Sequence, residues 1–121
     1  MKTIIAGSRG MDNYDFVKQT IIESGFEITE VVSGGARGVD SLGERYAKEN
    51  NIPIKQFVPD WGGLGKKAGL GKKAGHVRNR EMGDYADALV VIIINDSKGS
   101  VGMYEYAVKK GLKVHAVWLY S

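Results

Sequence analysis

Short continuous hydrophobic runs alternate along the chain with longer segments whose hydrophobic positions recur every three to four residues. Continuous runs are typical of buried strands, whereas the three-to-four repeat is typical of amphipathic helices. The predicted strands are 3–6, 30–33, 53–58, 88–94 and 113–120. The predicted helices run from an N-cap at Asp12 to a stop at Gly25, and over 38–49, 77–85 and 101–110.

Strands that alternate with helices predict an α/β fold, because parallel neighbours need a crossover connection, usually a helix. The run 88–94 is hydrophobic throughout, as expected of a central strand covered on both faces. We therefore expect a Rossmann-like three-layer sandwich with a mainly parallel sheet of about five strands. At 121 residues, the chain is expected to form a single domain, 1–121.

A glycine-rich turn joins the second predicted strand to the next helix, with the sequence Ser-Gly-Gly-Ala-Arg-Gly-Val-Asp over 33–40. Glycines let backbone amides approach a ligand, and the free amides of a helix start favour an anion. Arg37 would clamp a phosphate, and Asp40 would accept from a ribose hydroxyl. A tight turn in which Asp40 only helps the helix to start is the alternative. The candidate ligand-binding residues here are Ser33, Gly34, Gly35, Ala36, Arg37 and Asp40.

The first predicted strand ends in a second turn built on the same plan, Gly-Ser-Arg-Gly at 7–10, which matches Gly-Ala-Arg-Gly at 35–38. In an open α/β sheet, ligands bind in the crevice outside the carboxyl ends of the strands. Two arginine-bearing turns at that edge predict one cationic pocket. Gly7, Ser8 and Arg9 are therefore candidate ligand-binding residues.

Further candidates lie at the starts of two later helices. Arg78 and Asn79 stand where the helix 77–85 begins, although an arginine is slightly unfavourable there for the helix dipole. The alternative is a solvent-exposed first turn. Ser100 and Gly102 follow the strand 88–94, and their amides are expected to contact a phosphate, unless this segment is an ordinary loop.

The loop after the third predicted strand contains a tandem repeat, Gly-Leu-Gly-Lys-Lys-Ala at 63–68 and again at 69–74. A duplication, natural or engineered, explains it, since lengthening a loop costs little. The repeat also predicts a basic flap in which Lys72 meets phosphates. Asp60 and Trp61 precede it, and Trp61 would either stack on a base or pack in the core. No serine or threonine follows the Gly-Lys pairs, which excludes a Walker A loop.

Composition and charge are compatible with several ligands. Hydrophobic residues make up 43% and charged residues 26% of the chain, as in ordinary soluble proteins. The 17 glycines are about twice the usual share of about 7%. A net charge of +3 and a pI near 9.1 suit phosphorylated small molecules and nucleic acid equally.

The absence of cysteine excludes disulfides and thiolate catalysis. His76 and His115 have no second histidine or carboxylate at ligand spacing, so we expect neither a metal nor a cofactor. No run reads as a signal peptide or a membrane span, so a cytoplasmic protein without a membrane partner is expected.

Several segments resemble the YspA/YpsA-related branch of the SLOG superfamily, whose members are common in bacteria and phages. The superfamily includes DNA-processing DprA proteins, Lonely Guy phosphoribohydrolases and sensors of nucleotide signals, and its members are often homo-oligomers. The resemblance implies a pocket for a nucleotide or a nucleotide derivative. It rests on Gly7-Ser8-Arg9, the segment 33–40, Pro59-Asp60-Trp61, the segment 71–75, Arg78-Asn79 with Met82, and Ala86-Asp87.

Residues and resemblance together favour a protein that binds a nucleotide-derived signal, either ADP-ribose, an NAD-derived molecule or a cyclic nucleotide, as a sensor or a sequestering protein. One alternative is a Lonely Guy-like hydrolase of nucleoside monophosphates, with Arg78 and Glu105 as catalytic residues. In that comparison Asn79 replaces a lysine, and Glu105 falls one residue short of the expected glutamate. Asp40 is the other candidate carboxylate. A second alternative is DprA-like binding of single-stranded DNA through the lysine loop.

Overall fold

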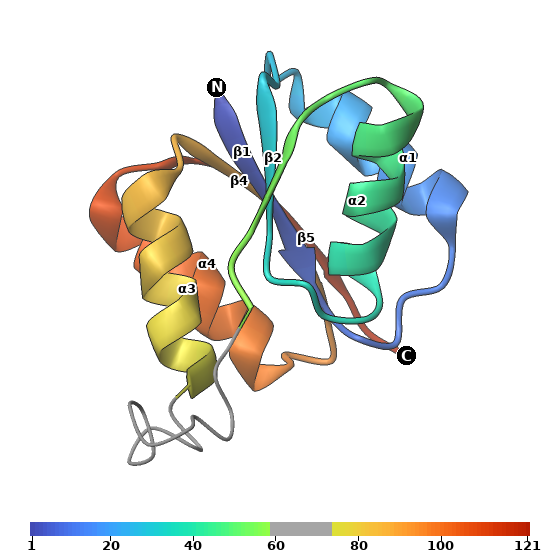
Figure 1. Ribbon diagram of the computed structural model, residues 1–121. Helices are drawn as coiled ribbons and strands as arrows, with labels where there is room; N and C mark the ends of the chain where they lie inside the picture. Colours follow the sequence, from blue (N-terminus) through green and yellow to red (C-terminus); the bar gives the residue numbers. More distant parts are fainter. Residues whose placement is uncertain (59–73) are drawn as a thin grey trace.

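The computed structural model of the protein describes residues 1–58 and 74–121 (Figure 1). Within these residues, five strands form one sheet and four helices flank it. The strands are β1 (Lys2–Gly7), β2 (Glu30–Ser33), β3 (Ile54–Gln56), β4 (Ala88–Ile94) and β5 (Lys113–Leu119). The helices are α1 (Tyr14–Ser24), α2 (Val39–Glu49), α3 (Ala74–Tyr85) and α4 (Lys98–Lys110).

The sheet has the strand order β3-β2-β1-β4-β5, and every pairing in it is parallel. Helices α1 and α2 cover one face, and α3 and α4 cover the other, which gives the three layers visible in Figure 1. The predicted Rossmann-like α/β fold is thereby confirmed, and the sheet is parallel throughout.

Two hydrophobic cores hold the layers together, one on each face of the sheet. Successive side chains of a strand point to opposite faces, so Ile4 belongs to the core under α3 and α4, and Ile5 to the core under α1 and α2. Strand β4 contributes to both cores and is fully buried from Ala88 to Ile93. The prediction of a central strand at 88–94 is thus correct.

Several element boundaries differ from the predicted ones. The N-cap of α1 is Asn13 rather than Asp12, because the Asn13 side chain accepts a hydrogen bond from the Phe16 amide at 3.1 Å. Helix α4 begins at Lys98, three residues earlier than predicted. Its first turn contains Gly99 and Ser100, residue types that favour a loop in isolation. Helix α3 likewise begins before the predicted residue 77, and strand β3 is only three residues long.

The order of the strands places a switch point between β1 and β4. From β1 the chain passes to β2 on one side, and the later strands β4 and β5 lie on the other side. Crossovers leaving in opposite directions open a crevice at the carboxyl ends of the two strands, where ligands bind in folds of this type. The turn after β1 and the turn after β4 both face this crevice. No helix in the described part of the chain is both long and apolar enough to cross a membrane.

Candidate functional site

The turn after β1 is held against the start of α2 by close backbone contacts. The carbonyl oxygen of Ser8 accepts a hydrogen bond from the Val39 amide at 3.3 Å. Gly38 makes this approach possible, because a Cβ atom there would lie 2.3 Å from the same Ser8 oxygen, and its φ of +75° favours glycine. Gly7 is equally confined, since a Cβ atom there would lie 2.3 Å from the Ile92 oxygen. The two turns with the Gly-x-Arg-Gly plan are therefore in direct contact.

Ser8 also ties β1 to β4. Its hydroxyl oxygen accepts a hydrogen bond from the Ile94 amide at 2.8 Å and lies 2.8 Å from the Ser97 hydroxyl. Ser8 itself is only 7% exposed. The Ser8 hydroxyl thus links the carboxyl end of β1 to the carboxyl end of β4. These contacts fix the backbone at the base of the crevice between the two strands.

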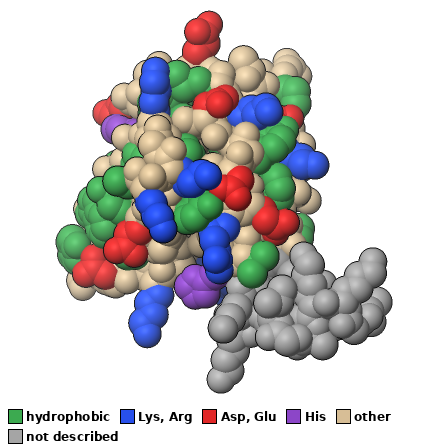
Figure 2. Space-filling model, turned by 90° about the vertical axis from the view of Figure 1, so that its left-hand side faces the viewer, with side chains coloured by type: hydrophobic (Ala, Val, Ile, Leu, Met, Phe, Trp, Pro, Cys, Tyr) green, Lys and Arg blue, Asp and Glu red, His purple; other side chains and the backbone are tan. Residues whose placement is uncertain are grey.

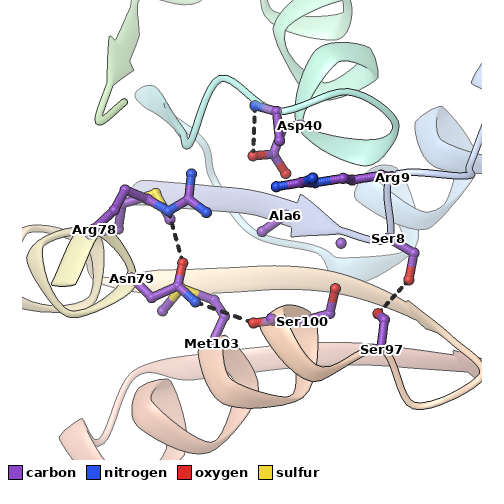
Figure 3. A pocket seen from close by; sticks show the side chains of 13 residues that line it. Ala6, Ser8, Arg9, Asp40, Arg78, Asn79, Ser97, Ser100 and Met103 are labelled. Carbon is purple, nitrogen blue, oxygen red and sulfur yellow. Dashed lines mark hydrogen bonds between the residues drawn. The ribbon is translucent and has the colours of Figure 1, made fainter. Parts of the chain in front are cut away.

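A cleft of about 300 Å³ lies at this crevice, and we call it the arginine cleft. Its walls come from the end of β1, the start of α2, one side of α3 and the start of α4. Figure 3 shows the side chains that line it. They belong to Ala6, Gly7, Ser8, Arg9, Ala36, Asp40, Arg78, Asn79, Met82, Ser97, Gly99, Ser100 and Met103.

Arg9 and Arg78 reach into the arginine cleft from opposite walls, with their guanidinium groups pointing toward one another (Figure 3). Arg78 is fixed by two hydrogen bonds: Nη1 donates to the Gly34 carbonyl oxygen at 2.8 Å, and Nε donates to Asn79 Oδ1 at 3.0 Å. Asn79 Nδ2 in turn donates to the Gly99 carbonyl oxygen at 3.2 Å, which links α3 to α4. Asn79 is therefore a positioning residue for Arg78.

The electrostatics of the arginine cleft favour an anion. Burial lowers the pKa of the Arg78 guanidinium, and the positive charge of Arg9 lowers it further, while Asp40 opposes the shift. Two like charges that face each other in a partly buried hollow repel, so a negatively charged group placed between them would be stabilised. Within residues 1–58 and 74–121, the exposed Arg9 side chain makes none of the backbone hydrogen bonds that hold Arg78, so it can adjust to such a group.

Asp40 supplies a negative charge on the same cleft. The residue is 4% exposed, and its Oδ2 accepts a hydrogen bond from the Ala36 amide at 3.3 Å. Burial raises the pKa of its carboxyl, although the amides of Ala36 and Gly7 and the charge of Arg78 act in the opposite direction. A buried acceptor of this kind can receive a hydrogen bond from a ligand hydroxyl.

A second cavity of about 230 Å³ adjoins the arginine cleft, and we call it the side cavity. It shares Arg9, Ala36 and Arg78 with the arginine cleft. Arg37 lines the side cavity, so all three predicted arginines border one hollow. The remaining lining residues are Gly34, Gly35 and Val58.

Three of the predicted residues lie elsewhere. Ser33 borders neither cavity, because its buried hydroxyl donates to Glu44 at 2.6 Å and accepts from the Gly35 amide at 3.1 Å. Gly102 and Glu105 face a different cavity, of about 410 Å³, beside Trp118. The structure therefore does not bring Arg78 and Glu105 to one site. The predicted residues Asp60, Trp61 and Lys72 lie outside the described residues.

Five lining residues were not predicted as site residues. Ala6 lies in the predicted strand 3–6 and Met82 in the predicted helix 77–85, and both buried residues also border the arginine cleft. Ser97 and Gly99 lie at the start of α4, Met103 lies inside it, and all three border the cleft. The small-residue run 95–102 after β4 was the available signal. Within residues 1–58 and 74–121, no three His, Cys, Asp or Glu side chains gather in a way that would hold a metal ion.

Comparison with solved structures shows a similar fold in DNA processing protein A (DprA) from Streptococcus pneumoniae. The TM-score is 0.74 at 22% sequence identity, and the match covers 95% of this chain and 49% of that one. The chain thus spans about half the length of that protein. No curated protein matches the sequence.

The first half of the sequence matches a family model over residues 1–62, just over half of the 121 residues. This segment contains both arginine-bearing turns and the strands β1 to β3. The match agrees with the resemblance seen in the residues themselves. The chain belongs to the YspA, cpYpsA-related SLOG family.

Proposed function

We propose that this protein binds a nucleotide or a nucleotide-derived signal, such as an ADP-ribose, an NAD-derived molecule or a cyclic nucleotide, in the arginine cleft. The protein would act as a sensor or as a sequestering protein. The observation that carries the proposal is the convergence of Arg9 and Arg78 on one hollow, with the Asp40 carboxylate beside them (Figure 3). A phosphate seated there would accept from both guanidinium groups, which match its geometry.

Asp40 favours a ligand that carries more than phosphate. A buried carboxylate on the cleft wall repels an inorganic anion, but it accepts hydrogen bonds from hydroxyl groups. A ribose phosphate presents both groups, with the phosphate toward the arginines and a hydroxyl toward Asp40. The combination therefore supports a sugar phosphate better than a simple anion.

The remaining lining offers apolar surface for a base. Met82 and Met103 are buried in the wall of the arginine cleft, and methionine side chains adapt to flat aromatic groups. The adjoining side cavity extends the space on the other side of Arg78. Ligand pockets typically measure about 300 to 1,000 Å³, so the arginine cleft alone stands at the lower bound for a small molecule.

A thermal-shift screen tests the proposal directly. AMP, ADP, ADP-ribose, NAD and cyclic AMP would be added at millimolar concentration, with ribose 5-phosphate and inorganic phosphate as partial ligands. A nucleotide at a hundred times its Kd should stabilise the fold by about 2.7 kcal/mol. Inorganic phosphate should stabilise it less, because it leaves Asp40 without a donor. Absence of any shift with all the nucleotides would overturn the proposal.

Charge-matched variants separate a specific site from general attraction to a basic protein. Arg78→Gln and Arg9→Gln should weaken binding measured by calorimetry by about tenfold or more, since a hydrogen bond to a charged group contributes about 1.5–3 kcal/mol. Arg45→Gln is the control, because Arg45 pairs with Glu49 on the exposed surface of α2 and its replacement removes the same charge. Equal losses in all three variants would indicate non-specific electrostatics.

A second candidate function is hydrolysis of the N-glycosidic bond of a nucleotide. One observation favours it: Asp40 has a raised carboxyl pKa and lines the arginine cleft, as a proton donor to a departing base would. Arg78 would hold the phosphate in that reaction. Glu105 would take no part, because it faces another cavity.

Binding of single-stranded DNA stays a prediction based on lysines outside the described residues. A titration with a single-stranded oligonucleotide tests it: binding with a steep salt dependence that nucleotides do not displace would support DNA binding instead.

A further inference from the structure

Strand β5 is an edge strand with one open side. It pairs with β4 along its whole length, from Lys113 opposite Ala88 to Leu119 opposite Ile94. In the sheet order β5 has no neighbour on its other side among the described residues. An open edge of this length presents a row of unpaired backbone groups to any strand that can pair with it. The strand has few of the features that prevent an edge from pairing with another strand. It contains no proline, and its lysine stands at the first position.

The hydrogen bonds at the two ends of β5 show which residues face outward. The Lys113 amide donates to the Asp87 carbonyl at 3.2 Å, and the Leu119 carbonyl accepts from the Asn95 amide at 2.8 Å. In a parallel pair, each residue directs its N–H and C=O to the same side, and successive residues alternate. The odd-numbered residues of β5 therefore bond to β4. Val114, Ala116 and Trp118 point their N–H and C=O groups to the open edge.

The side chains of these three residues share one face of the sheet. Val114 and Ala116 pack against the core under α3 and α4, and the Trp118 ring lies 5.3 Å from the Tyr104 ring of α4 in an edge-to-face contact. Trp118 is nevertheless 39% exposed, and Val108 on the same helix as Tyr104 is 52% exposed. Figure 2 views the α3 and α4 side of the molecule and shows hydrophobic side chains gathered at its left-hand edge.

We infer that β5 pairs with β5 of a second copy of this chain, antiparallel and about a two-fold axis at Ala116. The three outward residues then meet in register: Val114 opposite Trp118, Ala116 opposite Ala116, and Trp118 opposite Val114. All three pairs exchange both backbone hydrogen bonds, and the two sheets become one continuous sheet. A two-fold contact of this kind is the commonest arrangement of homodimers.

The sequence of the edge fits a second copy better than an unrelated strand. The small residue lies at the centre of the outward set, where the two strands approach the axis, and the large ring lies at its end. Each Trp118 therefore meets the smaller Val114 and clears the central alanines. The pattern continues one step further, because Leu112 would stand opposite Tyr120, which is 68% exposed. Shifting the register by two residues places Trp118 opposite Ala116, next to the axis, instead of opposite Val114.

Solution mass tests this interface, measured by light scattering coupled to size exclusion over a range of protein concentrations. The unmodified chain should form a dimer, and Trp118→Lys should shift the dimer dissociation constant at least tenfold toward monomer. Ala116→Pro is the second variant, because it removes an outward N–H and leaves the bonds to β4 in place. Ile22→Lys is the control, since Ile22 is 53% exposed on α1, which covers the face of the sheet opposite to the Trp118 side chain. Circular dichroism reports whether each variant is folded.

Cross-linking tests the register. The chain has no cysteine, so a single introduced thiol reacts without background. Ala116→Cys should give a covalent dimer with a short thiol-reactive cross-linker, because residues opposite each other in an antiparallel pair have Cα atoms about 5.5 Å apart. Gln56→Cys, on the edge strand β3, should not. A monomer at all concentrations, a dimer that survives both β5 variants, or equal cross-linking of the Gln56→Cys variant would overturn the inference.

Discussion

The guanidinium Nη1 of Arg78 lies 2.8 Å from the carbonyl oxygen of Gly34, a residue 44 positions earlier in the chain. The contact depends on the absence of a side chain at position 34. A Cβ atom there would lie 2.3 Å from Arg78 Nη1 and 2.8 Å from Asp40 Oδ2. Gly34 therefore sets the place of the two charged groups that we assign to ligand binding.

Gly34→Ala should weaken nucleotide binding about tenfold or more while the protein stays folded, a loss of the size expected when a hydrogen bond to a charged group is disturbed. The added methyl meets the ends of two side chains, and Arg78 can move away at the cost of its hydrogen bond to position 34. Gly10→Ala is the matched control, because no atom of the described residues lies within 4 Å of its Cβ position. Calorimetric titration of both variants with the same nucleotide measures the difference. Equal affinities would show that Arg78 is not part of the binding site.

Asp40→Asn should raise the melting temperature of the ligand-free protein at pH 7. Burial raises the pKa of Asp40 above its ordinary value of 3.8, so the folded chain holds the proton more tightly than the unfolded chain. The contribution of Asp40 to the free energy of unfolding is therefore greatest at low pH and falls as pH rises through the folded pKa. Asparagine carries no charge, so its advantage should shrink as the pH falls toward the ordinary pKa of an aspartate.

Scanning calorimetry of both proteins, from neutral pH down to the ordinary pKa of an aspartate, checks this dependence. The same variant should lose affinity for a ligand with a ribose hydroxyl, which would show that the wild-type residue is kept for binding at the expense of stability. A melting temperature at pH 7 that is equal to or below that of the wild type would contradict the prediction.

Gly38→Ala and Gly102→Ala should change stability in opposite directions. At Gly38, the φ of +75° and a Ser8 carbonyl oxygen 2.3 Å from the added carbon predict a loss of about 2 kcal/mol or more. At Gly102, inside α4, the Cβ position is open, and alanine should gain about 0.5–1 kcal/mol from its higher helix propensity. Urea unfolding of the two variants measures both. A stable Gly38→Ala protein would mean that the contact between the two turns is dispensable.

Ser8→Ala should cost more stability than Ser97→Ala, although the two hydroxyls are partners. Removing the Ser8 hydroxyl leaves the Ile94 amide without its acceptor, a loss of about 1–3 kcal/mol for a buried donor. Removing the Ser97 hydroxyl breaks only the bond between the two serines, which contributes about 0.5–1.5 kcal/mol. Chemical unfolding of each variant and of the double variant resolves the difference. Equal costs would show that Ile94 finds another acceptor.

The sequence predicts the fold well because its signals are local. The run 88–94 is hydrophobic at every position, and strands separated by helices permit few topologies. The two Gly-x-Arg-Gly turns likewise indicate their place at the carboxyl edge, which is where Arg9 and Arg37 lie. The boundaries of the elements were harder to predict. Helix α4 starts early, at Lys98, although glycine and serine at 99 and 100 have low helix propensity.

The partners of the site residues could not be predicted, because they depend on distances across the fold. Ser33 shares a glycine-rich turn with Gly34, yet its hydroxyl turns to Glu44 on α2. Glu105 lies five residues beyond Ser100, and this separation around α4 directs it to a different cavity. Sequence spacing predicts the helix or strand to which a residue belongs. Which side chains come into contact depends on how the helices and strands pack against one another.

The final prediction concerns turnover: incubation with AMP, other monophosphates or NAD should release no free base above the uncatalysed rate. Glycosidic hydrolysis usually requires two carboxyl groups that flank the scissile bond, one as acid and one as base or nucleophile. Of the described residues that line the arginine cleft, Asp40 is the one carboxylate, and Glu105 faces another cavity. Chromatography of the reaction mixtures measures the free base. Release that is lost in Asp40→Asn and kept in Glu105→Gln would contradict this prediction and establish the hydrolase, with Asp40 as its catalytic carboxyl.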